Sequence, residues 1–173
     1  CSSDGYTIRG KIAGLDNPYV YLLRYTGEVE VIDSAKVTKG DFVFKGKAEQ
    51  PEVVYLSTDK QQPFVHFFRE TGRISVDGAL SAPADIAVLG TPSNDIQRAF
   101  DEKIAALEEE FAKTGNDVQR DSLRKEYSKL MSDAVEMNRD NIYGVTTFLN
   151  NAYAFLSPEE VMEQIALFPA EWQ

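Results

Sequence analysis

The hydrophobic periodicity of this 173-residue chain changes close to Gly90. Before that residue, apolar and polar side chains alternate in short segments separated by turn residues, which is typical of half-buried β-strands. After Thr91-Pro92, apolar side chains recur at steps of three and four, which is typical of amphipathic helices. A run of strands followed by a run of helices predicts an α+β fold.

About eight short strands are expected in the first half of the chain. They lie at residues 6–12, 20–25, 28–33, 42–46, 53–56, 64–68, 74–76 and 86–88. These segments are rich in β-branched and aromatic residues, and glycine or asparagine stands at breaks where a positive φ is needed. The spacing of about 8 to 12 residues favours an antiparallel β-sandwich or a barrel-like sheet. We therefore assign residues 1–5 to a tether, 6–90 to a β domain and 91–173 to a helical region.

The helical region is expected to form an arm or small bundle of about four helices. Ser93 is predicted to cap the first helix, which ends at residues 114–116, and Asp117 is predicted to cap the second. The short connection predicts that these two helices are antiparallel neighbours. A third helix is expected around residues 145–153, and Ser157 caps a fourth, where two glutamates face the positive helix end.

The chain is acidic, with 28 acidic and 18 basic residues and a formal charge of -10. This charge repels phosphate backbones and anionic lipid headgroups, so no nucleic-acid partner is expected. No segment approaches the roughly 18 consecutive apolar residues of a membrane-spanning helix.

No residue is assigned to catalysis, to a metal or to a cofactor. His66 is the single histidine, and one histidine without ligands at metal spacing cannot build a zinc site. We expect it on a solvated or partly buried strand face. Asp33 and Ser34 are adjacent, so in a strand they point to opposite faces and do not form a triad with it. Their expected role is a hydrogen bond to the backbone at a strand end or turn.

The acidic clusters are expected to lie on solvated helix faces. Glu108, Glu109 and Glu110 fan around one helix axis and cannot converge on a ligand. Asp133, Glu136 and Asp140 stand at helical spacings of three and four, so they share one side of the helix. Such a stripe of carboxylates can bind a cation or a basic partner, although it is more often only a solvent-exposed face. No glycine-rich phosphate loop is present, because the glycines at 10, 14, 40 and 46 do not stand between a strand and a helix in the required pattern.

The aromatic residues allow another interpretation of function, a surface that binds a small ligand. The set is Tyr19, Tyr21, Tyr25, Tyr55, Phe64, Phe67 and Phe68. We expect most of these rings in the core, since aromatic side chains dominate core energetics.

Cys1 is the only cysteine, and a small polar run, residues 2–5, separates it from the first strand. One cysteine makes neither an intramolecular disulfide nor the C-x-x-C pair of thiol exchange. Its position is typical of the acylated first residue of a mature bacterial lipoprotein. The alternative is that residue 1 only marks where a fragment begins. Attachment by more than one acyl chain would hold the domain stably at a membrane.

Several segments together resemble a particular family. They are residues 6–12, 20–22, 33–37, 41–47, 50–51, 64–70 and 74–91, with residues 138–141, 148–149, 158–160 and 168–169 in the helical region. In this order they resemble the domain of unknown function at the N-terminus of lipoproteins of Gram-negative gut and oral bacteria. A thioredoxin-like module commonly follows that domain.

The resemblance implies a lipoprotein of the Gram-negative cell envelope, facing the periplasm or the cell surface and anchored through lipid on Cys1. Two functions remain open. In one, the chain is a non-catalytic, membrane-tethered interaction or spacer module whose β domain and helical arm position a partner, such as an envelope protein, or a downstream thioredoxin-like domain. In the other, it is the N-terminal accessory portion of a thiol-disulfide oxidoreductase whose C-x-x-C domain lies downstream. No catalytic residue carries over, because the chain as given contains no C-x-x-C.

Overall fold

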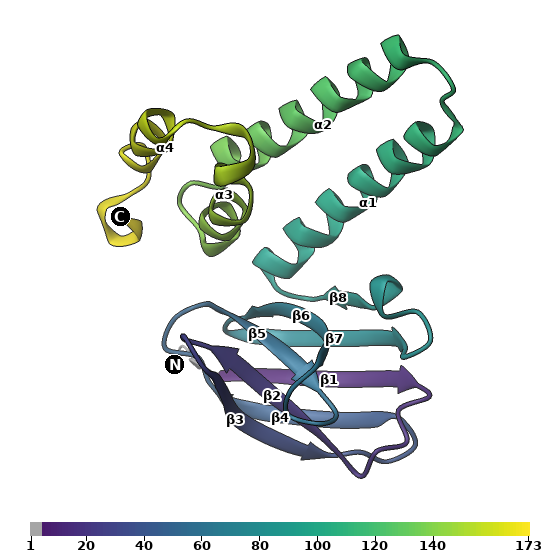
Figure 1. Ribbon diagram of the computed structural model, residues 1–173. Helices are drawn as coiled ribbons and strands as arrows, with labels where there is room; N and C mark the ends of the chain where they lie inside the picture. Colours follow the sequence, from purple (N-terminus) through teal and green to yellow (C-terminus); the bar gives the residue numbers. More distant parts are fainter. Residues whose placement is uncertain (1–4) are drawn as a thin grey trace. The chain divides into compact units, whose positions relative to one another are not determined.

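The computed structural model describes residues 5–173, with the side chains of residues 152–155 left aside. The chain divides into two compact units, one ending at Arg98 and the other beginning at Ala99. The first unit contains eight strands (Figure 1). They are β1 (Gly5–Ala13), β2 (Tyr19–Tyr25), β3 (Val29–Lys36), β4 (Asp41–Lys47), β5 (Glu52–Ser57), β6 (Pro63–Arg69), β7 (Gly72–Ala79) and β8 (Ala87–Leu89). The α+β class and all eight expected strands are therefore confirmed.

The strands form two four-stranded sheets, with the orders β4-β1-β7-β8 and β3-β2-β5-β6. Neither order closes on itself, so the sheets are not a barrel. All pairs are antiparallel except β1 and β7, which run parallel with Ile8 opposite Ile74. The expectation of an antiparallel sheet is thus wrong for one pair. The sequence between β1 and β7 contains all four strands of the second sheet, and the pairing of such distant segments leaves no local signal.

The core of the first unit consists of the inward-facing residues of both sheets. On β2 these are Val20 and Leu22, and on β5 they are Val54 and Leu56, all completely buried. Burial of each such side chain contributes about 1.5 to 3 kcal/mol to folding. Because strand side chains alternate, the residues between them face outward from the same sheet.

Two glycines in the first sheet allow aromatic rings to lie over the neighbouring strand. The Phe42 ring of β4 occupies the space that a Cβ would need at Gly10, and the Tyr6 ring of β1 does the same at Gly46. Gly10 and Phe42 are directly opposite each other in the register, as are Tyr6 and Gly46. These glycines therefore serve packing within the sheet.

A row of charged side chains crosses the second sheet. Glu52 of β5 forms ion pairs with Arg69 of β6 and with Arg24 of β2, the latter at 3.5 Å. Arg24 also pairs with Glu30 of β3 at 2.8 Å. The Arg69 guanidinium lies 5.1 Å from the centre of the Tyr6 ring in the other sheet. The row thus links all four strands and ties the two sheets together.

The first helix, α1 (Pro92–Lys113), begins with a buried polar junction to the end of β6. Ser93 donates from its backbone N and from its Oγ to the two carboxylate oxygens of Glu70, at 2.8 and 2.9 Å. The prediction of Ser93 as the N-cap is wrong, because the helix already begins at Pro92 and Ser93 lies inside its first turn. Glu70 instead satisfies the helix start, and a carboxylate is favourable there.

The remaining helices are α2 (Asp117–Met137), α3 (Ile142–Phe155) and α4 (Pro158–Ile165). Asn116, rather than the predicted Asp117, caps α2, because the Asn116 side chain accepts from Val118 N at 2.8 Å. Ser157 caps α4 as predicted and forms a reciprocal capping box with Glu160.

The helical unit has its own small core. Val135 of α2 and Phe148 of α3 pack with Phe168, and the two phenylalanine rings are 5.4 Å apart between centroids. Helix α1 meets α2 at the turn between them, where Arg120 lies over the Phe111 ring. Farther along, α2 packs against α3. Helices α1 and α2, which were predicted to be antiparallel neighbours, thus contact each other at the turn between them. The main packing partner of α2 is α3.

Candidate functional site

The outward face of the sheet β3-β2-β5-β6 carries all four tyrosines of the aromatic set. We call it the tyrosine face, formed by Tyr19, Tyr21, Tyr25, Val29, Val31, Tyr55 and His66. The face follows from strand alternation, since Val20 and Leu22 beside Tyr21 on β2, and Val54 and Leu56 beside Tyr55 on β5, point into the core. The strand register therefore places tyrosine rings on the outer face of the sheet.

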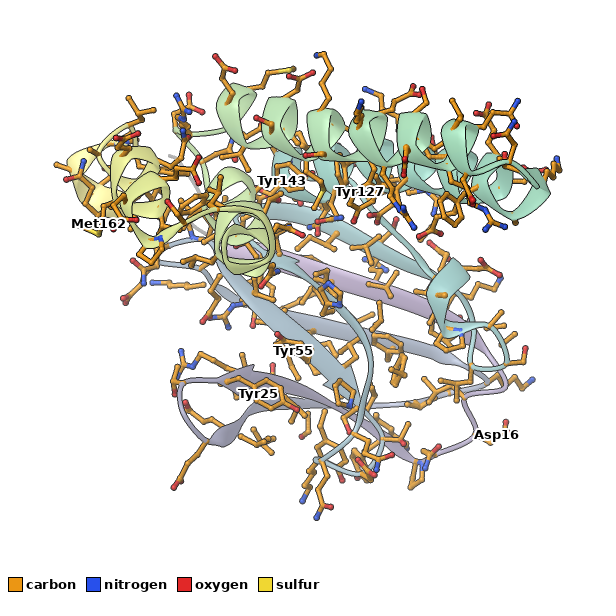
Figure 2. All side chains as sticks on the ribbon, turned by 45° about the horizontal axis from the view of Figure 1, so that its top comes forward. Asp16, Tyr25, Tyr55, Tyr127, Tyr143 and Met162 are labelled. Atoms are coloured by element: carbon orange, nitrogen blue, oxygen red, sulfur yellow. The ribbon has the colours of Figure 1, made fainter. Side chains whose placement is uncertain are left out.

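The rings on this face contact one another across three strands. Tyr25 of β2 packs edge-to-face on Tyr55 of β5, with centroids 4.6 Å apart (Figure 2). Tyr55 is also opposite His66 of β6, and these two rings are 5.9 Å apart. Such aromatic contacts stabilise by about 0.5 to 1.5 kcal/mol beyond their burial. The ladder fixes the ring positions while Tyr19 and Tyr25 stay 47% and 42% exposed.

A turn between β5 and β6 borders the tyrosine face, and Asp59 organises it. The Asp59 carboxylate accepts from the backbone N of Gln61 at 2.9 Å and of Gln62 at 2.8 Å, and from Ser57 Oγ at 2.8 Å. The hydrogen bonds from the Gln62 and Gln61 amides, in that order, and then from Ser57 hold the Asp59 pKa below its usual value of 3.8. The carboxylate is thus stabilised in its charged form, which keeps the turn closed.

This turn places two polar groups at the tyrosine face. Lys60, at a left-handed φ of 65°, holds its Nζ 4.7 Å from the centre of the Tyr21 ring. The backbone oxygen of Gln61 accepts from the Tyr25 hydroxyl at 3.3 Å. The result is a surface of phenol rings with a cation against Tyr21 and an imidazole against Tyr55. It can bind a partner by ring contacts and by hydrogen bonds from the hydroxyls.

The seven rings of the aromatic set lie in two places, the outer face of the sheet and the buried interior. Tyr19, Tyr21, Tyr25 and Tyr55 belong to the tyrosine face, whereas Phe67 is in the core. Phe68 is buried, and Phe64 is partly buried against the core. The expectation that most of the rings are core is therefore wrong for the four tyrosines, because strand alternation sends them outward.

His66 is exposed on a strand face, as expected. Asp33 and Ser34 lie inside β3 and not at a turn, next to a register shift in the β2–β3 pairing. The expected hydrogen bond to the backbone is confirmed, since Asp33 Oδ1 accepts from Ser34 N at 2.7 Å. Neither residue belongs to a contact with His66 that the structure describes, so no triad is assembled among them.

The acidic clusters lie on the helical unit. Glu108, Glu109 and Glu110 are all exposed on α1, as predicted. Asp133 forms an ion pair with Lys129 at 2.5 Å, while Glu136 and Asp140 are exposed. Among residues 5–173, no three histidine, cysteine or carboxylate side chains gather at a metal-binding spacing.

Lys60 and Asp59 were not singled out by the sequence. A Ser-x-Asp run between two strands is a recognisable turn signal, so Asp59 could have been found. Lys60 could not, because its place over Tyr21 depends on which strands are neighbours. Cys1, the predicted lipid-attachment residue, lies outside the described residues. Within the part of the chain that the structure describes, no helix is long and apolar enough to cross a membrane.

The fold and the tyrosine face together define a class, a small two-sheet β unit with an aromatic outer face, followed in sequence by a helical unit. The sequence of residues 6–97 matches the family described as a domain of unknown function, DUF4369. The match spans more than half of the chain, so the chain belongs to this family, and the matched range coincides with the β unit. No curated protein matches the sequence.

Proposed function

We propose that this chain is a non-catalytic interaction module, tethered to a membrane through lipid on Cys1, and that the tyrosine face binds a partner protein of the cell envelope. The observation that carries the proposal is the ladder of Tyr25, Tyr55 and His66, which is ordered by ring contacts while Tyr25 and His66 stay exposed and Tyr55 is half-buried. Tyrosine is enriched at protein interfaces because it offers a large contact area and a polar end with few rotatable bonds.

The neighbouring features support a protein partner. Val29 and Val31 of the edge strand β3 extend the apolar area and are 45% and 44% exposed. Apolar rings surrounded by hydrogen-bonding groups are the usual anatomy of an interface centre and its rim. Lys60 and the tyrosine hydroxyls supply the polar part. The module would act by holding its partner at the membrane surface.

A comparison of matched serine variants tests the binding role. The native full-length protein and a double variant, Tyr25→Ser with Tyr55→Ser, are each crosslinked chemically in cells and isolated. The partner proteins crosslinked to each are quantified by mass spectrometry. The control is Val43→Ser, which changes a 43% exposed residue on β4 of the other sheet. We expect one specific crosslinked protein to fall at least tenfold in the tyrosine variant and to stay constant in the control. Equal recovery in all three would overturn the proposal.

The tether is tested separately by metabolic labelling with a radioactive fatty acid. The native protein should incorporate label and a Cys1→Ala variant should not. Equal labelling of both proteins would end the anchor proposal, without bearing on the tyrosine face.

A further inference from the structure

The helical unit contains a pocket of about 200 Å³ that the tyrosine face does not use. Its apolar wall consists of Met131 and Val135 of α2, Phe148 of α3 and Leu156 after α3. Val135 and Phe148 also belong to the core of this unit. The pocket therefore has a floor that is fixed by core packing.

The polar part of the pocket wall carries no charged side chain. It consists of Ser128 and Ser132 on α2, Asn151 on α3 and Gln164 on α4. Both serines are exposed, so they stand where the pocket opens to solvent. A charged ligand would find no counter-ion among the lining residues, and its desolvation would be unfavourable.

Two existing hydrogen bonds orient the amides of this wall. Arg139 donates from a guanidinium nitrogen to Gln164 Oε1 at 2.9 Å, and since arginine only donates, the oxygen must face it. The Gln164 amide nitrogen is thereby left as its donor. Asn151 Nδ2 donates to the backbone oxygen of Thr147 at 2.7 Å, which leaves Asn151 Oδ1 as an acceptor. The wall thus offers one oriented donor and one oriented acceptor.

From these features, the structure assigns to this pocket the binding of a small uncharged molecule with an apolar body and one hydroxyl or amide group. A cavity of about 150 Å³ with an apolar lining holds benzene, so this pocket has room for a single ring or a short aliphatic chain and its polar group. A hydroxyl both donates and accepts, which matches the pair of Gln164 and Asn151. This assignment is independent of the tyrosine face.

Benzyl alcohol is the probe, titrated into the full ¹⁵N-labelled chain and followed by amide chemical shifts. We expect saturable shifts confined to residues around Ser132, Val135, Phe148 and Gln164, with a Kd on the order of 1 mM for a molecule of this size. Benzoate, which is charged and has no hydroxyl to donate to Asn151 Oδ1, should bind at least tenfold more weakly. Shifts that do not saturate, or that spread over both units, would overturn the assignment.

Variants at the pocket mouth complete the test. Ser132→Leu should fill the opening and weaken benzyl alcohol binding at least tenfold, while Ser122→Leu, at an exposed position on α2 away from the pocket, should not. Ser128→Leu replaces Ser132→Leu if the latter does not fold. Gln164→Glu keeps an acceptor for Arg139 and removes the amide donor, so it should weaken benzyl alcohol several-fold. Unchanged binding in the filled variants would show that the probe binds elsewhere.

Discussion

The side-chain amide of Asn94 pairs with both backbone groups of Phe68, as a neighbouring β-strand would. Its Oδ1 accepts from Phe68 N at 2.9 Å, and its Nδ2 donates to Phe68 O at 2.7 Å. The same nitrogen donates to Thr91 Oγ1 at 2.8 Å. Asn94 thus covers part of the free edge of β6, and an exposed strand edge is otherwise a site of unwanted pairing.

Asn94→Ala should destabilise the β unit by about 2 to 4 kcal/mol, because it removes two buried hydrogen bonds to the backbone of β6. Urea denaturation followed by circular dichroism measures the change. Asn150→Ala, at an exposed position on α3, is the control and should stay within about 0.5 kcal/mol of the native protein. A loss below about 1 kcal/mol in Asn94→Ala would mean that water replaces the amide at this edge.

Gly144→Ala should destabilise the helical unit by roughly 3 kcal/mol, because a Cβ at this position would overlap the backbone oxygen of Asn138. The close approach is held by Asn141, whose side chain bonds both Asn138 Oδ1 and Gly144 N, at 3.0 and 3.2 Å. The control is Gly115→Ala, which meets nothing within 4 Å. Thermal unfolding of both variants should separate them clearly, and equal melting temperatures would contradict the packing described at the α2–α3 turn.

The stability of the helical unit should fall between pH 10 and 12, in part because of Tyr143. Burial raises the pKa of Tyr143 from 10.0 to about 12, a hydrogen bond with Thr147 opposes this, and the charge of Asp101 adds to it. Since the folded pKa is the higher one, the stabilisation is complete below pH 10. It is lost as the pH rises to 12, and amounts to about 2 to 3 kcal/mol.

Tyr143→Phe isolates this contribution, because the chain contains eight tyrosines. Denaturation at pH 8 and pH 11 should show a smaller loss of stability in Tyr143→Phe than in the native protein. Absorbance at alkaline pH should show one late-titrating tyrosine that the variant lacks. Parallel losses in the two proteins would contradict the burial of this hydroxyl.

Asp59→Asn should loosen the turn between β5 and β6 without unfolding the β unit. The charged carboxylate accepts three hydrogen bonds within the turn, and the neutral amide is a weaker acceptor. We expect faster hydrogen exchange at the Gln61 and Gln62 amides and no change in β1. Because the Asp59 pKa is lowered, the native turn should show the same loosening only as the pH falls below about 3.8. Unchanged exchange in the variant would show that the turn does not depend on this carboxylate.

The strands could be predicted from sequence because alternation along a strand is a local signal. Val20, Tyr21 and Leu22 show it directly, since the middle residue faces outward and the other two are buried. The parallel pairing of β1 with β7 could not be predicted, because it depends on contacts between distant segments. The start of α1 was misplaced for a related reason. Its first turn bonds to Glu70, 23 residues earlier in the chain.

The candidate site was predicted in part. Tyr21, Tyr25 and Tyr55 were in the aromatic set, but Phe67 was grouped with them although it faces the core. A list of rings does not state which face each occupies until strand register is known. Lys60 was missed because its interaction with Tyr21 joins a turn to a strand that precedes it by more than 30 residues.

Site-specific photocrosslinking tests the binding role of the tyrosine face most directly. A photoreactive phenylalanine analogue at position 25, in the full-length protein in its native cells, should give one discrete crosslinked protein on irradiation. The same analogue at position 43, on β4, should give none, although Tyr25 and Val43 are 42% and 43% exposed. Crosslinks of equal yield at both positions, or none at position 25, would contradict the proposal that this face binds a partner.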